Sequence, residues 1–232
     1  MIDLNNFLTG QQEVYGRLER NLDVVRRDGT TPPKTAQERD GYLVILRHPE
    51  EIVDRCTDFS RKIAQIVPAL VYEGTAVHTT LAVINMNYRA ADVQSKDEAS
   101  VRILENALHR VAGNFRLVQF QYNGWLFDTG TTLAQGIADA SFVALANEIH
   151  GSLEARAVAE HVGKIQQPWG GHITVSRFLE LTPGDQMEGY FDLVRREPAL
   201  LPSVPKVVNL AYVSVKRGIL NMDVLAEFPL IR

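Results

Sequence analysis

Apolar and polar residues follow two different periods along this chain. Short apolar or alternating runs are typical of strands, and apolar residues at every third or fourth position are typical of amphipathic helices. The runs predict strands at residues 42–46, 69–72, 77–84, 115–122, 125–127, 131–137, 172–179, 207–215 and 219–228. The helical spacing predicts helices at residues 49–67, 97–111 and 139–162, and another that ends near residue 196.

The order of these elements indicates an α+β fold. Strands and helices mix without the strict strand–helix–strand alternation of a parallel sheet, and Asn123-Gly124 has the composition of a tight hairpin turn. The chain also lacks a glycine-rich phosphate loop of the P-loop or Rossmann kind. We therefore expect largely antiparallel sheets.

The first 40 residues differ from the rest of the chain. Val14, Leu18, Leu22 and Val25 lie at helical spacing and predict one amphipathic helix. The stretch that follows is rich in charged and turn-forming residues and has almost nothing apolar. This pattern predicts an N-terminal helical extension with its loop at residues 1–40, joined to a main domain at residues 41–232.

Composition narrows the functional classes. The 232 residues are 45% hydrophobic and carry a formal net charge of −4, without the basic excess of proteins that grip long duplex nucleic acid. No apolar run is long enough to span a bilayer, and the N-terminus lacks the pattern of a signal peptide. We expect a cytoplasmic monomer that binds no membrane and takes a small substrate or only the end of a nucleic acid. The single cysteine, Cys56, lies on the apolar face of a predicted helix and is interpreted as a core residue.

Two short segments of similar pattern carry the candidate chemistry. His78-Thr79-Thr80 and His172-Ile173-Thr174 both lie in predicted strands. Residues two apart in a strand share a face, so His78 should stand beside Thr80, and His172 beside Thr174. The opposite face of each strand is mostly apolar and suits a core.

Such a pair of strands suits the cleavage of a phosphodiester. That reaction needs a base to activate the nucleophile and an acid to protonate the leaving oxygen, and histidine serves either role near neutral pH. Threonine hydroxyls beside the rings can donate to the non-bridging phosphate oxygens. These four groups need no metal, and neither strand places a carboxylate or a third histidine at ligand spacing. A satisfied polar pair at a sheet surface is the plainer interpretation of either segment alone.

Three further residues lie near these segments in the sequence or share their pattern. His150 belongs to a third His-x-Ser segment, but that segment lies in a predicted helix, and we interpret His150 as a surface or helix-packing residue. Trp169 precedes His172 in a glycine-rich loop and could stack on a substrate ring or cover the edge of the core. Strand alternation points Arg177 away from the face of His172, so it is not a candidate.

The segments VHTTLAVI and GHITVSRF resemble the two motifs of the 2H phosphoesterase superfamily, which includes LigT-like 2'-5' RNA ligases and cyclic phosphodiesterases. In that pattern a histidine and a Ser or Thr flank a hydrophobic residue. Thr79 departs from it, because threonine is less hydrophobic than the usual residue. The likeness covers roughly residues 41–230, and we place no counterpart for the first 40 residues.

The resemblance implies two pseudo-symmetric lobes, each with an antiparallel sheet, and helices packed outside a central cleft. It implies hydrolysis of a 2',3'-cyclic phosphate, or of a related phosphodiester in a nucleotide or at an RNA end, without a metal or cofactor. His172 would act as base and His78 as acid, with Thr80 and Thr174 binding the phosphate. A module of the same fold that binds a ligand or an RNA end without turnover is the alternative, and an interaction protein that acts through its N-terminal helix is another.

Overall fold

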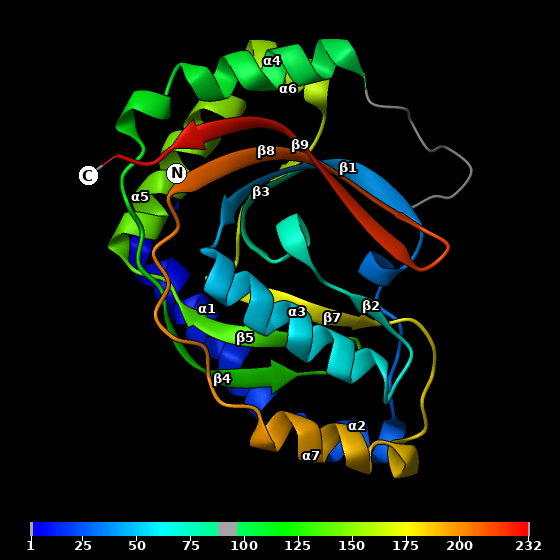
Figure 1. Cartoon of the computed structure of the whole chain (residues 1–232). Coiled ribbons are helices and arrows are strands. Elements are labelled where there is room, and N and C mark those ends of the chain that lie inside the picture. Colours follow the sequence, from blue (N-terminus) through cyan, green and yellow to red (C-terminus); the bar gives the residue numbers. More distant parts are fainter. Residues whose placement is uncertain (1, 88–96, 232) are drawn as a thin grey trace.

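Two antiparallel sheets form the frame of the protein in a computed structural model, which describes residues 2–87 and 97–231 (Figure 1). The five-stranded sheet has the order β6-β3-β1-β8-β9, and the four-stranded sheet has the order β2-β7-β5-β4. The strands are β1 (Arg39–Arg47), β2 (Ala69–Val71), β3 (His78–Asn87), β4 (Gln121–Phe127), β5 (Thr131–Ile137), β6 (Ile165–Gln166), β7 (Ile173–Phe178), β8 (Val207–Lys216) and β9 (Ile219–Pro229). The predicted α+β class with antiparallel sheets is confirmed.

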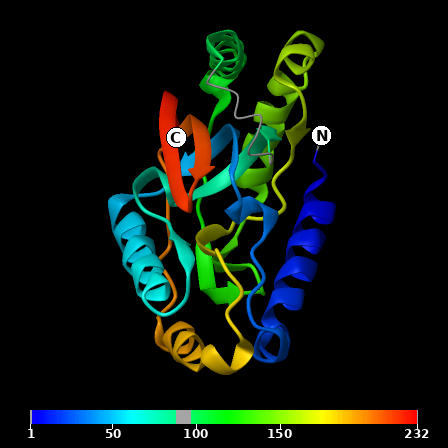
Figure 2. The ribbon, with the colours of Figure 1, turned by 90° about the vertical axis from the view of Figure 1, so that its right-hand side faces the viewer.

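The helices cover the outer faces of the two sheets. They are α1 (Leu4–Glu19), α2 (Leu22–Asp28), α3 (Glu50–Ala64), α4 (Glu98–His109), α5 (Ala140–Leu153), α6 (Arg156–Val162) and α7 (Glu188–Arg196). Helix α3 packs on β2 and β7, whereas α5 packs on β3 and contacts α4. Figure 2 shows α1 and α3 on opposite flanks of the molecule.

Each sheet is therefore covered by a helix that follows a strand of the other sheet. Helix α3 comes after β1 of the five-stranded sheet, and α5 comes after β5 of the four-stranded sheet. This exchange ties the two halves together and leaves their inner faces directed toward each other.

Helix α3 illustrates how the sequence produces these elements. Glu50 and Glu51 lie in its first turn and basic residues in its last turn, so charge complements the helix dipole at both ends. Its apolar face buries Ile52, Cys56 and Phe59 in the main core. Cys56 is a buried free thiol, as the apolar spacing predicted, and burial raises its pKa to about 12. A raised pKa leaves the thiol protonated and unreactive at neutral pH.

The predicted hairpin at Asn123-Gly124 is wrong. Strand β4 runs through both residues, which form a bulge between the pairs Tyr122–Gly136 and Trp125–Ala134. The turn lies after residue 127, where one carboxylate oxygen of Asp128 accepts hydrogen bonds from the backbone N–H groups of Gly130 and Thr131. Local side-chain bonds of this kind stabilise a turn without an Asn-Gly pair.

Four other predicted elements have different bounds in the structure. The single N-terminal helix is two helices, α1 and α2, and the predicted helix 139–162 is likewise divided into α5 and α6. Residues 115–120 precede β4 rather than belonging to it, with an isolated bridge between Phe120 and Ser203. Strand β1 begins at Arg39, and Phe7, Val25 and Ala36 are buried in the main core.

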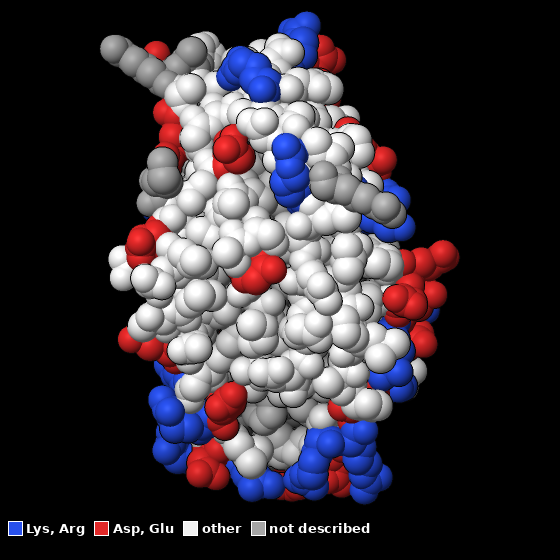
Figure 3. All heavy atoms as spheres, turned by 90° about the vertical axis from the view of Figure 1, so that its left-hand side faces the viewer, with Lys and Arg blue, Asp and Glu red and all other residues white. Residues whose placement is uncertain are grey.

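The face of the molecule drawn in Figure 3 carries its charges in small mixed groups. On the face drawn in Figure 3, Lys and Arg gather near the two ends with Asp and Glu beside them, and the middle is mostly uncharged. The described residues on this face thus form no continuous basic surface, which is the feature that proteins use to follow a duplex. Within the described ranges, no helix is long and apolar enough to cross a membrane.

Candidate active site

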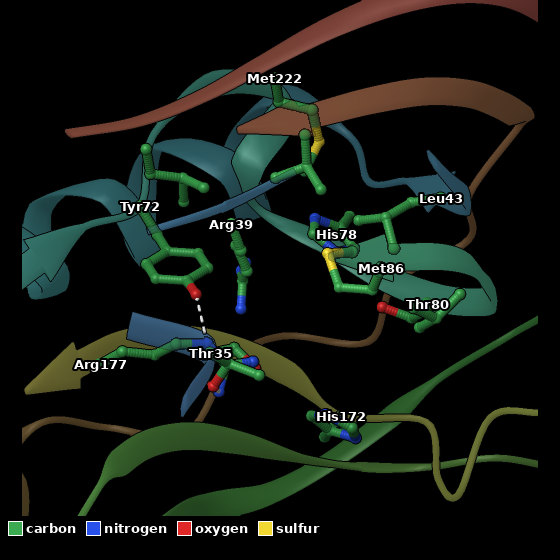
Figure 4. A pocket seen from close by; sticks show the side chains of 14 residues that line it. Thr35, Arg39, Leu43, Tyr72, His78, Thr80, Met86, His172, Arg177 and Met222 are labelled. Atoms are coloured by element: carbon green, nitrogen blue, oxygen red, sulfur yellow. Dashed lines mark hydrogen bonds between the residues drawn. The ribbon is translucent and has the colours of Figure 1, made fainter. Parts of the chain in front are cut away.

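A pocket between the two sheets brings the two His-x-Thr segments together (Figure 4). His78 and Thr80 come from β3 of the five-stranded sheet, whereas His172 directly precedes β7 of the four-stranded sheet and Thr174 lies near its start. All four line the pocket. The other lining residues are Thr35, Arg39, Leu43, Tyr72, Val83, Met86, Arg177, Val213, Leu220 and Met222.

The alternation of side chains along each strand explains why the histidine and the threonine of each segment both reach the pocket. Thr79 and Ile173, the middle residues of the two segments, are fully buried. The flanking residues His78, Thr80, His172 and Thr174 are half-buried and reach the pocket. The predicted sharing of a face by each His and Thr is thus what the structure shows.

Arg177 lines the same pocket, and the prediction that it points away is wrong. Along β7, Ser176 pairs with Thr132 but Thr174 pairs with Leu133, so β7 has one residue more than β5 at this point. Val175 and Ser176 are consequently both buried. A bulge of this kind reverses the alternation beyond it, which brings Arg177 onto the face of Thr174.

Two guanidinium groups make one side of the pocket positive. Arg177 donates from Nε to the hydroxyl of Tyr72 at 2.7 Å and from Nη1 to the hydroxyl of Thr35. Arg39 enters the pocket from the start of β1 (Figure 4). None of the described residues that line the pocket is acidic, so the pocket suits an anion.

Burial and positive charge keep the two pocket histidines neutral. Burial, together with the charges of Arg177 and Arg39, lowers the pKa of His78 to about 4, although the backbone carbonyls of Ala76 and Thr75 act in the opposite direction. Burial lowers the pKa of His172 to about 3, and the charge of Arg177 and the nearby His78 act in the same direction. Both rings are therefore neutral at pH 7. Their Nδ1 atoms are buried, and within the described part of the chain neither has a hydrogen-bond partner of ordinary geometry.

A buried polar network beneath the pocket was not found from the sequence. His48 places Nδ1 2.8 Å from the hydroxyl of Ser203 and Nε2 3.0 Å from the hydroxyl of Thr79. The Thr79 hydroxyl in turn lies 3.3 Å from the carbonyl oxygen of His172. Thr79 occupies the position where a hydrophobic residue is usual, and that departure was the available signal. Its hydroxyl links the first segment to the second across the two sheets.

His150 and Trp169, the other two residues considered from the sequence, are not among the residues that line the pocket. His150 is buried in α5 with Nε2 3.2 Å from the carbonyl oxygen of Leu81, so it is a helix-packing residue. The Trp169 ring stacks on the His172 ring with centroids 3.9 Å apart and planes at 19°. Trp169 is 39% exposed, and stacking of a substrate ring on it stays a prediction.

The described residues contain no group of three or more His, Cys, Asp or Glu side chains that could hold a metal ion. The side chains that the pocket offers are imidazole, hydroxyl and guanidinium groups. Of these, guanidinium and hydroxyl groups donate hydrogen bonds to phosphate oxygens, and only imidazole is a common metal ligand.

Comparison with known proteins shows the fold. No protein-family model matches the sequence, and no curated protein matches it either. Among solved structures, TT0787 of Thermus thermophilus is 19% identical with a TM-score of 0.53, covering 83% of this chain and 97% of that one. Escherichia coli LigT in its apo form is 16% identical with a TM-score of 0.50, covering 84% of this chain and all of LigT. The chain thus has the fold of LigT, as the two motifs predicted.

Proposed function

We propose that this protein is a phosphodiesterase that hydrolyses a 2',3'-cyclic phosphate, or a related phosphodiester of a nucleotide or an RNA end, without a metal. One observation carries the proposal: two His-Thr pairs from separate sheets line one pocket that also holds two arginines and no acidic side chain among its described lining residues. The pocket thereby offers a single small anion groups that transfer protons, groups that bind its oxygens and groups that neutralise its charge.

The chemistry follows from these groups. Taking the roles that the resemblance implies, His172 accepts a proton from water as the water oxygen bonds to phosphorus. The bond from phosphorus to the leaving oxygen breaks, and His78 donates its proton to that oxygen. A cyclic diester thereby becomes a monoester with a free hydroxyl. Thr80 and Thr174 donate to the non-bridging oxygens, whose charge grows in the transition state.

The protonation states require the substrate to take part in preparing the site. With pKa values near 4 and 3, neither His78 nor His172 is in its protonated imidazolium form at pH 7, so neither can act as the acid. A phosphodiester anion between the rings stabilises an imidazolium and offsets the charges of Arg39 and Arg177. We infer that the acid acquires its proton as the substrate binds.

The same low pKa values favour the second candidate, a module that binds the phosphate of a nucleotide or RNA end without turnover. In that case the rings would stay neutral in the complex and act only as hydrogen-bonding groups. Neutral rings bind an anion but supply no acid for the leaving oxygen.

The test is a substrate panel of 2',3'-cyclic nucleotides, ADP-ribose cyclic phosphate and 2'-5' oligonucleotides. Wild type is compared with His78→Ala, His172→Ala and a control, His161→Ala, whose side chain is exposed on α6. Turnover that both pocket variants abolish and the control keeps is the expected result. Tight binding without turnover would replace the proposal with the binding module, and failure to bind any of the panel would overturn both.

A further inference from the structure

Gln11 is a polar residue in the buried face of α1. It is 2% exposed, on a helix whose other buried residues are Phe7, Tyr15 and Leu18. A buried amide costs free energy unless it is hydrogen-bonded. The Oε1 atom of Gln11 accepts a hydrogen bond of 2.9 Å from the backbone N–H of Gly171, 160 positions along the chain. His172 directly follows Gly171 in the chain, so this hydrogen bond holds the backbone next to the pocket.

The backbone at this point is packed too tightly to shift without a cost. A Cβ atom on Gly136 of β5 would lie 2.0 Å from the carbonyl oxygen of Gly171, and one on Gly170 would lie 3.3 Å from Oε1 of Gln11. Tyr15, one helical turn after Gln11, donates a 2.7 Å hydrogen bond to the carbonyl oxygen of Gly136. Helix α1 therefore forms a hydrogen bond with each of two backbone segments that pack against each other, Gly171 beside His172 and Gly136 of β5.

A second route from α1 leads to the ring of His172. The edge of the Tyr15 ring faces the Trp169 ring at a centroid distance of 5.8 Å and an interplanar angle of 73°. The Trp169 ring in turn stacks on the ring of His172. Trp169 thus contacts both rings, in an edge-to-face arrangement with Tyr15 and a stacked one with His172.

We propose that Gln11 and Tyr15 are positioning residues, which hold the Trp169–His172 segment so that the His172 ring keeps its orientation in the pocket. The inference rests on the proposed function, since the orientation of His172 matters most if this ring moves a proton. Loss of the Gln11 acceptor leaves a buried N–H group unsatisfied beside His172, and that peptide relaxes by turning. A displacement of about 1 Å in a catalytic group costs about 100-fold in rate.

The decisive variants change the hydrogen-bonding groups of the side chain and keep its length. Gln11→Met removes the amide oxygen and the amide nitrogen, whereas Gln11→Glu keeps an acceptor oxygen and replaces the nitrogen with a second oxygen. Gln12→Met makes the same change at the next, exposed position of α1 and is the matched control. Tyr15→Phe removes a single oxygen and serves where Gln11→Met does not fold.

For Gln11→Met we expect kcat to fall about 10-fold to 100-fold while KM changes less than about threefold. The reason is that His172 is displaced, whereas the side chains that bind the phosphate are not. Gln11→Glu should recover most of the loss, and Gln12→Met should match wild type. Equal kcat in Gln11→Met and Gln12→Met at a temperature where both are folded would overturn the proposal.

A readout independent of turnover separates this inference from the proposed function. The ring nitrogen signals of His172 are followed by NMR and identified by their absence in His172→Ala. They should shift in Gln11→Met and stay in place in Gln12→Met, even if no member of the panel is hydrolysed. Unchanged His172 signals in Gln11→Met would show that α1 does not position the ring.

Discussion

The guanidinium of Arg177 is fixed by the hydroxyl of Tyr72, which accepts a 2.7 Å hydrogen bond from Nε. Its Nη1 donates to the hydroxyl of Thr35, and the guanidinium group so held lines the pocket together with His78 and His172 (Figure 4). An arginine held in this way is oriented before an anion arrives, so less side-chain entropy is lost when the anion binds.

Replacing Arg177 with glutamine should weaken substrate binding and change the pH profile together. We expect KM to rise by about 10-fold or more, because a charge-assisted hydrogen bond contributes about 1.5–3 kcal/mol. Since the charge of Arg177 lowers the pKa of both pocket histidines, the pKa seen in the acid limb of kcat/KM should move upward in the variant. Steady-state kinetics from about pH 2.5 to pH 9, a range that includes the pKa values of both histidines, measures both effects. An acid limb that stays in place would show that Arg177 does not act on the histidines.

Phosphate binding should take up a proton from solution. The free protein binds none at His78 or His172 at pH 7, because their pKa values are about 4 and 3. An anion between the rings raises both pKa values, and an uptake approaching one proton indicates that one ring is charged in the complex. Calorimetric titration with dimethyl phosphate, a diester that stays a monoanion near pH 7, in buffers of different ionisation enthalpy gives the number directly. An observed enthalpy that is the same in every buffer would contradict the mechanism and favour the binding module.

The hydroxyls of Thr80 and Thr174 should act in the transition state rather than in binding alone. Serine keeps the hydroxyl and valine keeps the shape, so the pair of variants separates the two properties. We expect valine at either position to lower kcat about 100-fold to 1,000-fold and serine to retain much of the activity. Single-turnover rates give the comparison without interference from product release. Equal rates for the serine and valine variants would remove the hydroxyls from the mechanism.

Turnover should be insensitive to chelators. The pocket offers two imidazoles with hydroxyl and guanidinium groups, and its described lining residues include no carboxylate or thiolate. Rates measured after dialysis against EDTA should equal those measured with added Mg²⁺, Mn²⁺ or Zn²⁺. Activity lost in EDTA and restored by one divalent ion would be incompatible with the proposed roles of the two histidines.

The sequence was sufficient to predict the part of the site that depends on strand alternation. His78 and Thr80 share a face because β3 is regular between them, and the same holds for His172 and Thr174. Arg177 was missed because the bulge at Val175 and Ser176 depends on the pairing of β7 with β5. A pairing register belongs to two strands at once, so it is not readable from either strand alone.

Contacts between distant segments were equally out of reach. Gln11 reaches Gly171 and His48 reaches Thr79 only through the tertiary arrangement of the two sheets and α1. At Asn123-Gly124, a strong local turn signal was overridden, because the Asp128 side chain stabilises the turn five residues later. In each case a partner far along the chain, or a competing local bond, determines the structure.

The neutral ring of His48 should contribute to the acid sensitivity of the fold. Burial lowers the pKa of His48 to about 3, with a contribution from His78, whereas an unfolded histidine titrates near 6.5. The unfolded chain therefore binds one more proton than the folded chain between these values. The stabilisation from the neutral ring is complete above pH 6.5 and is lost as pH falls toward 3. For one such histidine the free energy of unfolding falls by about 2 kcal/mol between pH 7 and pH 5.

His48→Gln, with an amide that can still bond to Ser203 and Thr79, should remove that part of the pH dependence. Thr79→Val, which keeps the ring, should retain it. Urea unfolding at pH 7 and pH 5 measures the difference for each protein. If the free energy of unfolding falls as steeply in His48→Gln as in wild type, His48 is not a neutral buried ring in the folded protein.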